Sequence, residues 1–400
     1  MANISSSNGL EKRPKLRFPG FDESYRTTPL GEIASLVNRT DPKSNAPIMM
    51  LSAGNGFIMQ SEKYSRDNAG QSLKKYILLK QGELAYNHGA SKAKQFGCCY
   101  ELTEPEARIP YVYHCFKIND HEYTPFIAMA LNNAKMDKQL KRLVSSSVRM
   151  DGLLNISFED YMSVTLHLPS STEQKHIADF LKKIDERIAA QEKLLASLKK
   201  YKRGLLMHYF SDDKTQLWTQ CSVSQIGKVI TGSTPPTNDR SNYDGDLLFC
   251  APGDVGEQKY ISSTEKRVSP KGFALGRPLP PNSVIVTCIG LIGKLGIAKT
   301  SMITNQQINA LVVSEGFDHE FIYYAFENFF PEYRSKVSMQ TLPILSKSEF
   351  EKLMIKVPDL DVQHKISSHL AAMDRRIEHT QQELNALIEH RRGIMQQLFI

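Results

Sequence analysis

The stretch Gln174–Phe210, QKHIADFLKKIDERIAAQEKLLASLKKYKRGLLMHYF, returns at Gln363–Phe399 as QHKISSHLAAMDRRIEHTQQELNALIEHRRGIMQQLF. The two stretches align without a gap at an offset of 189 residues, and Leu168-Pro169 upstream falls on Val357-Pro358 at the same offset. Repetition at a fixed offset indicates a duplicated structural unit. The chain therefore consists of two copies of one unit, each a globular region followed by a long helix.

Apolar residues recur in both stretches at steps of four and three, which is the spacing of a coiled-coil seam. Each seam carries polar residues at the same two positions, Gln191 with Thr380 and Lys202 with Arg391. Such residues fix the register of paired helices at some loss of stability. Their gap-free repetition disfavours the alternative of two unrelated amphipathic helices, each packed on its own globular region. The seam is predicted to consist of Ile177, Leu181, Ile184, Ile188, Leu195, Leu198, Ile366, Leu370, Met373, Ile377, Leu384 and Leu387.

A helix over Glu173–Phe210 would be roughly 57 Å long at 1.5 Å per residue. Because each helix follows its own globular region, the two helices can pair along their length only if the chain returns. We therefore predict an α+β fold with two mixed α/β domains separated by two long antiparallel coiled-coil helices and related by an approximate two-fold axis. The expected boundaries are a disordered lead-in over 1–20, globular domains over 21–154 and 211–343, and repeats with a long helix over 155–210 and 344–400.

The globular regions contain short β-branched runs separated by glycines, which is typical of strands joined by tight turns. In the second region these runs are NSVIVTCIG, GIAKT and INALVV, followed by a helix from about His319 to Val337. In the first they are YILLKQGELAYN and YVYHCFKI, with a helix predicted over Pro125–Val144. Upstream of the repeats the correspondence is looser: Phe126-Ile127 falls on Phe321-Ile322, and Leu30–Ile33 on Ile226–Val229.

The net charge of +7 and the pI near 8.9 favour a polyanionic partner only weakly. Six cysteines without a CxxC spacing argue against a zinc site and a secreted disulfide framework. The polar N-terminus does not look like a signal peptide, and the longest apolar run, 283–293, is too short for a membrane helix. We expect a soluble, cytoplasmic protein.

Sequence motifs of common enzyme classes are not apparent. The nearest string to a Walker A loop, GLIGKLG at Gly290–Gly296, has its glycines at the wrong interval and leucine where Ser or Thr must meet magnesium. The Pro-Pro pairs in TPPTN and LPPNS lack the flanking residues of an adenine-methylating loop, and no HExxH occurs. A non-catalytic chain without its own cofactor or metal is expected.

For a DNA partner, the candidates for contacting base edges are polar and basic side chains in glycine-containing loops. Arginine and lysine pair with guanine edges, and asparagine pairs with adenine. Surface loops in general share this composition, so the choice is not specific. A helix face with Lys135, Lys138, Lys141 and Arg142 is either a solvated surface or a phosphate-contacting ridge. The predicted DNA-contacting residues are Asn87, His88, Ser91, Lys92, Lys94, Arg149, Thr237, Asn238, Arg240, Asn242, Lys294, Lys336 and Gln340.

The segment LPSSTEQKHIADFLKKIDERI and its echo VPDLDVQHKISSHLAAMDRRI resemble the conserved regions of type I restriction-modification specificity subunits. In that family a Pro-x-x-x-x-Gln-x-x-Ile segment opens the helix, and here Pro169 and Pro358 each stand five residues before Gln174 and Gln363. The second globular region is similar to the family's target-recognition domains in TGSTPPTN and NQQINALVV. The first matches less well, with YVYHCFKI where NQQINALVV would stand.

The resemblance implies that each globular domain reads one half of a bipartite, asymmetric target in double-stranded DNA. It also implies partners: two methylation subunits that bring S-adenosylmethionine, and motor-nuclease subunits that use ATP and magnesium. Two alternatives remain open, namely the specificity subunit of a related combined cleavage-methylation (type IIB-like) enzyme and a coiled-coil adaptor that does not bind DNA. The target sequence, the spacer length, the half-site read by each domain and the oligomeric state of the free subunit cannot be deduced from the sequence.

Overall fold

The computed structural model describes residues 13–63, 70–92, 94–144, 154–256, 258–337 and 343–400. It divides into two compact units: unit 1 comprises residues 1–191 with 383–400, and unit 2 comprises residues 192–382. The division cuts both long helices near their middle, so each unit holds one globular region and a segment of each helix. None of the described helices combines the length and apolar character needed to cross a membrane.

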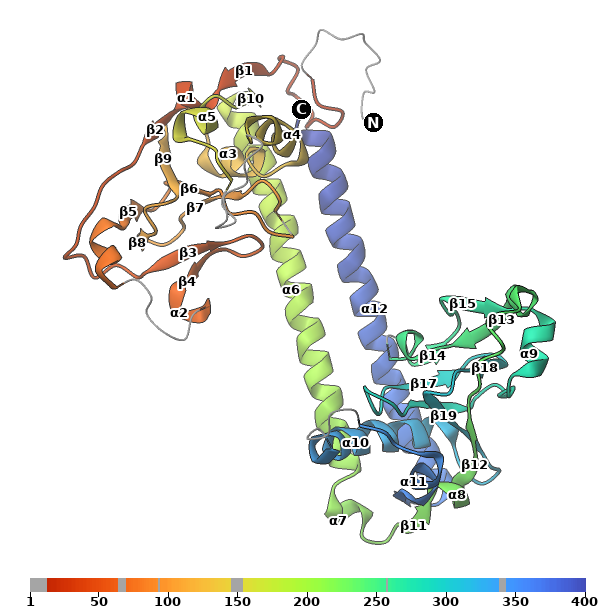
Figure 1. The fold of residues 1–400 in the computed structure, drawn as a ribbon. Coiled ribbons are helices and arrows are strands. Elements are labelled where there is room, and N and C mark those ends of the chain that lie inside the picture. The colour runs from red at the N-terminus through yellow and green to blue at the C-terminus, as the bar shows by residue number, and fades with distance from the viewer. Residues whose placement is uncertain (1–12, 64–69, 93, 145–153, 257, 338–342) are drawn as a thin grey trace. The chain divides into compact units, whose positions relative to one another are not determined.

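Unit 1 is built on a four-stranded sheet in the order β2-β9-β6-β7, all pairs antiparallel (Figure 1). Three further two-stranded antiparallel sheets, β1-β10, β3-β4 and β5-β8, belong to the same unit. The strands are β1 (Arg26–Pro29), β2 (Ala34–Leu36), β3 (Met49–Ser52), β4 (Gly56–Met59), β5 (Ile77–Lys80), β6 (Leu84–Asn87), β7 (Cys98–Glu101), β8 (Glu106–Ile109), β9 (His114–Ile118) and β10 (Thr165–Leu168). The helices are α1 (Leu30–Ile33), α2 (Gln60–Lys63), η1 (Gly70–Lys75), α3 (Thr124–Ala130), α4 (Ala134–Leu143), α5 (Phe158–Met162) and α6 (Ser171–Tyr209), whose second half belongs to unit 2.

Unit 2 repeats this plan with a five-stranded sheet in the order β12-β19-β16-β17-β14 and a second sheet β15-β13-β18. Its strands are β11 (Thr219–Ser222), β12 (Gly227–Thr231), β13 (Tyr243–Cys250), β14 (Tyr260–Ile261), β15 (Lys266–Val268), β16 (Val284–Thr287), β17 (Leu295–Ala298), β18 (Met302–Thr304), β19 (Ile308–Val313) and β20 (Met354–Val357). Its helices are α7 (Asp212–Thr215), α8 (Val223–Ile226), η2 (Arg240–Asn242), η3 (Pro252–Asp254), α9 (Pro270–Leu275), α10 (His319–Val337), α11 (Lys347–Lys352) and α12 (Leu360–Leu398), which ends in unit 1.

The predicted fold class of mixed α/β units carried on two long helices is confirmed. The apolar runs named from the sequence form β5, β6 and β9 in unit 1 and β16, β17 and β19 in unit 2. The segment YVYHCFKI contains β9, which lies between β2 and β6 as β19 lies between β12 and β16. The two runs therefore occupy the same place in equivalent sheets although their sequences differ.

The two long helices run antiparallel within each unit. In unit 1, Ile177 and Leu181 near the start of α6 share a core with Leu398 and Phe399 at the end of α12. In unit 2, Leu206 near the end of α6 shares a core with Ile366 and Leu370 near the start of α12. All twelve predicted seam residues are buried or half-buried.

One helix prediction was wrong in detail. The helix expected over Pro125–Val144 is two helices, α3 and α4, interrupted at residues 131–133. The Asn133 side chain caps α4 by accepting from the backbone N–H groups of Lys135 and Met136. Asparagine competes with the helical backbone for hydrogen bonds in this way, which is why it favours helix starts over helix interiors.

The alignment of Leu30–Ile33 with Ile226–Val229 was also wrong, by three residues. The structural counterpart of α1 is α8: Leu30 N–H donates to Val164 O at 2.8 Å, and Val223 N–H donates to Leu353 O at 2.9 Å. Val164 and Leu353 stand at the repeat offset of 189, so Leu30 corresponds to Val223. The apolar-Gly dipeptides Leu30-Gly31 and Ile226-Gly227 suggested the wrong register.

Part of the predicted lead-in is ordered. Residues 1–12 lie outside the described residues, but residues 13–20 pack on the helices of unit 1. Leu16 N–H donates to Gln397 O at 3.1 Å, and the Arg17 guanidinium makes two 2.8 Å hydrogen bonds to the buried Glu173 carboxylate. A bidentate pair of this kind is a strong, directional contact, and it holds the segment in place despite its polar composition.

Candidate nucleic-acid interface and its supporting joints

The predicted reading loop of unit 1 joins β6 to β7 and is shaped by its own side chains. Asn87 Oδ1 accepts from Gly89 N–H at 2.9 Å, and Ser91 Oγ accepts from Lys94 N–H at 3.0 Å. Lys94 Nζ donates to the backbone oxygen of Asn132 at 2.9 Å, just beyond the end of α3. Asn87 and Lys94 thus hold the loop, whereas Ser91 and Lys92 are exposed and available to a ligand.

His88 does not present its ring to solvent. Its residue is only 8% exposed, and the ring lies 5.1 Å from the His114 ring and 6.4 Å from the Tyr86 ring, measured between centroids. Tyr86 in turn stacks on Tyr161 at 3.9 Å. Placed in this aromatic cluster, His88 is suited to shaping the base of the loop, and a role in reading bases does not fit its burial.

The predicted loop of unit 2 precedes and includes η2. Thr237, Asn238 and Arg240 are exposed. Asn242, in contrast, is buried and donates from Nδ2 to Pro236 O at 3.0 Å, so it supports the loop from inside. The loop is also held by Asp239: the Lys271 ammonium and Ser241 hydrogen-bond to this carboxylate and lower its pKa to about 2.

The remaining predicted contact residues are scattered. Lys294 is the last residue of the turn between β16 and β17 and is half-exposed. Lys336, near the end of α10, forms an exposed ion pair with Glu332 at 2.7 Å. Arg149 and Gln340 lie outside the described residues. On α4 the residues Lys135, Lys138, Lys141 and Arg142 are all exposed, as expected for a ridge or a solvated face, but the Lys135 ammonium group donates to Phe399 O at 2.8 Å.

A glutamine at the start of each long helix joins that helix to its globular region. Gln174 Oε1 accepts from Tyr123 N–H at 2.9 Å while its Nε2 donates to Pro169 O at 3.0 Å. Gln363 makes the same two contacts, with Asp318 N–H at 2.9 Å and Pro358 O at 2.9 Å. Both glutamines are buried. This explains the Pro-x-x-x-x-Gln spacing: the side chain satisfies the proline carbonyl behind it and the residue that precedes α3 or α10.

The second polar break in each seam is an ion pair between the helices. Lys202 on α6 pairs with Asp374 on α12 in unit 2 at 2.7 Å, and Arg391 on α12 pairs with Asp185 on α6 in unit 1. Asp185 and Asp374 stand at the repeat offset of 189, as do Lys202 and Arg391. Each helix therefore contributes one acid and one base, and the contacts recur with the partners exchanged.

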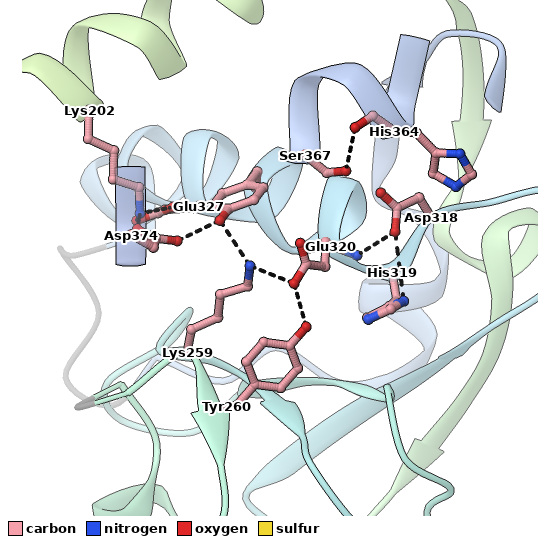
Figure 2. Close-up of polar contacts among 11 residues, drawn as sticks. Lys202, Lys259, Tyr260, Asp318, His319, Glu320, Glu327, His364, Ser367 and Asp374 are labelled. Atoms are coloured by element: carbon pink, nitrogen blue, oxygen red, sulfur yellow. Dashed lines mark hydrogen bonds and ion pairs between the residues drawn. The ribbon is translucent and has the colours of Figure 1, made fainter. Parts of the chain in front are cut away.

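In unit 2 this ion pair is part of a larger network that ties the helices to the globular region (Figure 2). Lys202 Nζ also contacts both carboxylate oxygens of Glu327 on α10 at 2.9 Å, and Tyr324 on α10 donates to Asp374 at 2.5 Å. Lys259, just before β14, donates to the Tyr324 hydroxyl and to Glu320, each at 2.9 Å. Tyr260 donates to the same Glu320 carboxylate. The described part of unit 2 thus links α6, α10, α12 and the start of β14 through one set of charged contacts.

The electrostatics of this network follow from burial and pairing. Burial, with a smaller effect from Asp374, raises the pKa of Glu327 despite its contact with Lys202. Burial alone would lower the pKa of Lys202, but the carboxylates of Glu327 and Asp374 outweigh it and raise that pKa. Burial also raises the pKa of Tyr324. Lys202 has two carboxylate partners, Glu327 and Asp374, so the charge of its buried ammonium group is compensated within the network.

Sequence reasoning located only Lys202 of this network and Arg391 of the equivalent ion pair in unit 1. The polar break marked Lys202 and Arg391, but no signal in the sequence pointed to Glu327, Tyr324 or Lys259, which lie on elements brought together by the fold. Among the described residues no group of three or more His, Cys, Asp or Glu side chains is placed to hold a metal ion.

Comparison with known proteins places these features in a family. The family described as Type I restriction modification DNA specificity domain matches residues 74–200 and 216–390, which includes most of both units. A type I restriction enzyme MjaIX specificity subunit from Methanocaldococcus jannaschii is 30% identical over 178 residues, 43% of this chain and 41% of that protein. A type I restriction enzyme HindI specificity subunit from Haemophilus influenzae is 29% identical over 108 residues, 26% of this chain and 24% of that protein. The matches thus span less than half the length of either relative.

Solved structures show the same fold. The S subunit of a type I restriction-modification system from M. genitalium has a TM-score of 0.64 at 14% identity and covers 97% of this chain and 99% of its own. A chain from a type I restriction-modification complex has a TM-score of 0.57 at 16% identity, covering 94% of this chain and 97% of its own. Because the family match takes in more than half of the sequence, this chain belongs to the type I restriction-modification DNA specificity family.

Proposed function

We propose that this chain is the sequence-reading subunit of a type I restriction-modification complex and recognises a bipartite, asymmetric target in double-stranded DNA. The observation that carries the proposal is the family match across both units. The two units share the order of four sheet strands, β2-β9-β6-β7 and β12-β19-β16-β17, and the same helix joints, but their loops differ. Equal scaffolds with unequal loops are suited to reading two unlike half-sites.

The mechanism we propose is positional. Basic side chains would seat each unit on the phosphate backbone, while polar loop residues would contact base edges. In unit 1 the candidates are Lys92 and Ser91 for bases and the basic face of α4 for phosphates. In unit 2 the candidates for bases are Thr237, Asn238 and Arg240. Two tethered reading units bind DNA more tightly than either alone. Once the first unit is bound, the second meets its half-site at a high effective concentration.

The chain itself is proposed to be non-catalytic. Two methylation subunits would supply S-adenosylmethionine and modify adenine, and motor-nuclease subunits would cleave unmodified DNA with ATP and magnesium. The absence of a Walker A sequence and of an adenine-methylating loop supports this division of labour. The site of action proposed for the complex is the cytoplasm, where the cellular DNA of a bacterium or archaeon lies.

The proposal is tested by methylome sequencing of cells that express the chain with its methylation subunits. The expected result is adenine methylation at one bipartite, non-palindromic motif, absent from cells that lack the chain. A gel-shift assay with a duplex carrying that motif should show specific binding by the complex. Replacing Asn238 and Arg240 together with alanine should weaken the discrimination between bases in one half-site of the motif and leave the other half-site unchanged. Methylation that is independent of the chain, or no binding to duplex DNA, would contradict the proposal and favour an adaptor role.

A further inference from the structure

The β6–β7 hairpin of unit 1 and the β16–β17 hairpin of unit 2 are counterparts. The backbone oxygen of His88 accepts from Leu154 N–H at 2.9 Å, and that of Cys288 accepts from Leu345 N–H at 2.8 Å. Each hairpin closes on a left-handed glycine, Gly97 at φ +84° and Gly293 at φ +76°. Each hairpin is thus anchored to the segment that leads into the repeat of its own unit.

Neither closing glycine leaves room for a side chain. A Cβ atom on Gly97 would lie 2.4 Å from Asn87 O, and one on Gly293 would lie 2.5 Å from the Phe330 ring. Only glycine adopts such a conformation at no steric cost. The backbone of both hairpins is therefore fixed where the second strand begins.

The hairpins differ at their tips. Among the described residues of 88–97 in unit 1, Ala90, Ser91, Lys92 and Gln95 are exposed, whereas of residues 288–293 in unit 2 only Leu291 is, at 59%. Two reading units with different targets require hairpins that are fixed in the same way where they leave the sheet but that differ at their tips. The tip of unit 2 offers a large apolar side chain, whereas the described part of the tip of unit 1 offers an alanine beside polar and charged side chains.

The backbone that carries Leu291 is held in place from both sides. Thr287 Oγ donates to Leu291 O at 2.5 Å, and Lys294 N–H donates to the same hydroxyl at 3.0 Å. Gly290 N–H donates to Pro343 O at 3.0 Å, while Ile289 and Ile344 form a β-bridge. A rigid tip loses little conformational entropy when a ligand binds. An exposed leucine on so fixed a turn contributes nothing to the core of unit 2.

We propose that Leu291 determines specificity by contacting the 5-methyl group of a thymine in the half-site read by unit 2. This inference rests on the proposed function and names the base contact. A leucine side chain can neither donate nor accept a hydrogen bond, so it distinguishes bases through apolar contact. The thymine methyl is the apolar group that base pairs present in the major groove.

The experiment replaces each thymine of the mapped target, one at a time, with deoxyuridine, which lacks only the methyl group. Binding to the full-length chain in complex with its methylation subunits is measured for the wild type and for Leu291→Ala. At one position the wild type should lose roughly three- to fivefold in affinity, the effect of removing one buried methyl group. Leu291→Ala should bind thymine and deoxyuridine equally at that position, and Leu291→Met should retain the preference.

Leu275→Ala is the matched control, because Leu275 is 54% exposed in the same unit and lies on α9. It should leave the deoxyuridine response of the wild type unchanged. The inference is overturned if no thymine responds to the loss of its methyl group, or if Leu291→Ala responds as the wild type does. Failure of the proposed function would look different, since the wild-type complex would then select no bipartite target at all.

Discussion

Lys202 and Arg391 occupy the same position in the two repeats, but their surroundings differ. The Lys202 side chain is 13% exposed and contacts two carboxylates in unit 2. The Arg391 side chain is 30% exposed and contacts one, Asp185, which is itself 42% exposed. Removing one partner of a buried ion pair leaves an uncompensated charge, whereas exposed pairs contribute little. The same substitution should therefore have unequal effects at the two positions.

We predict that Lys202→Met lowers the free energy of unfolding by about 3 kcal/mol, because Glu327 and Asp374 lose their shared counter-ion. Arg391→Met serves as the matched control and should cost about 1 kcal/mol or less. Urea denaturation of the full chain measures both. Equal losses at the two positions would show that the network around Lys202 is not the cause.

The pH dependence of unit 2 should carry a contribution from His319. Burial lowers the pKa of His319 from its ordinary value of 6.5, and this effect exceeds the opposite one of Asp318 and Glu320. The unfolded chain then binds this proton more readily than the folded one. Stability is therefore unaffected well above pH 6.5 and falls as the pH drops below 6.5 toward the folded-state pKa.

His319→Gln should flatten this fall. The check is thermal unfolding of the wild type and the variant between pH 7.5 and pH 5. Any excess in the Tm of the wild type over that of the variant should shrink toward acid pH or change sign. A difference between them that does not change with pH would refute the assignment to His319.

At the scale of elements, each long helix begins with a glutamine that satisfies two backbone groups at once. Gln174 and Gln363 are buried, and their backbone partners lie at the starts of α3 and α10. A buried backbone N–H without a partner costs free energy comparable to that of a lost hydrogen bond. The two glutamines thus link the orientation of the helix to that of the first helix of its globular region.

We predict that Gln363→Ala destabilises the chain by about 1–3 kcal/mol, the cost of leaving a buried donor unsatisfied. Amide hydrogen exchange at Asp318 should become faster, while exchange at Tyr123 in unit 1 should not change. Gln174→Ala should give the reverse pattern. Gln382→Ala, on the exposed face of α12, is the control and should change neither amide. Unchanged exchange at Asp318 in Gln363→Ala would contradict the linking role.

At the scale of the whole molecule, the proposed function requires that the two helices set the unread spacer of the target. The ion pairs Asp185–Arg391 and Lys202–Asp374 fix the register in each unit. Removing residues 190–196 from α6 and 380–386 from α12 deletes one heptad from each helix and leaves both ion pairs in register. One heptad corresponds to roughly 10 Å of helix, close to the rise of about three base pairs.

The expected outcome is that methylation at the original spacer length is lost, and that any motif still modified keeps its bases but has a shorter spacer. Methylome sequencing of cells with the shortened chain provides the measurement. Deleting seven residues from α6 alone is the control, since the two ion pairs can then no longer form in the same register and stability should fall. Methylation at the original spacer in the doubly shortened chain would show that the helices do not set the distance.

The sequence by itself determined the duplication, the two long helices, their seam and six of the strands, namely β5, β6, β9, β16, β17 and β19. Each of these depends on a local period or on repetition, which can be read along the chain. The loop residues Ser91, Lys92, Thr237, Asn238 and Arg240 were likewise found from composition, and the structure leaves them exposed.

Only the tertiary structure decided which of the predicted side chains face solvent and which support the fold. In the structure His88 and Asn242 are buried, and residues 13–20 pack on unit 1. The structure also corrects the alignment of the two repeats, because Leu30 corresponds to Val223 and not to Ile226. It also brought Glu327, Tyr324 and Lys259 to Lys202. These outcomes depend on contacts between residues that are distant in the sequence. Burial and charge pairing are properties of the packed neighbourhood, so no local pattern encodes them.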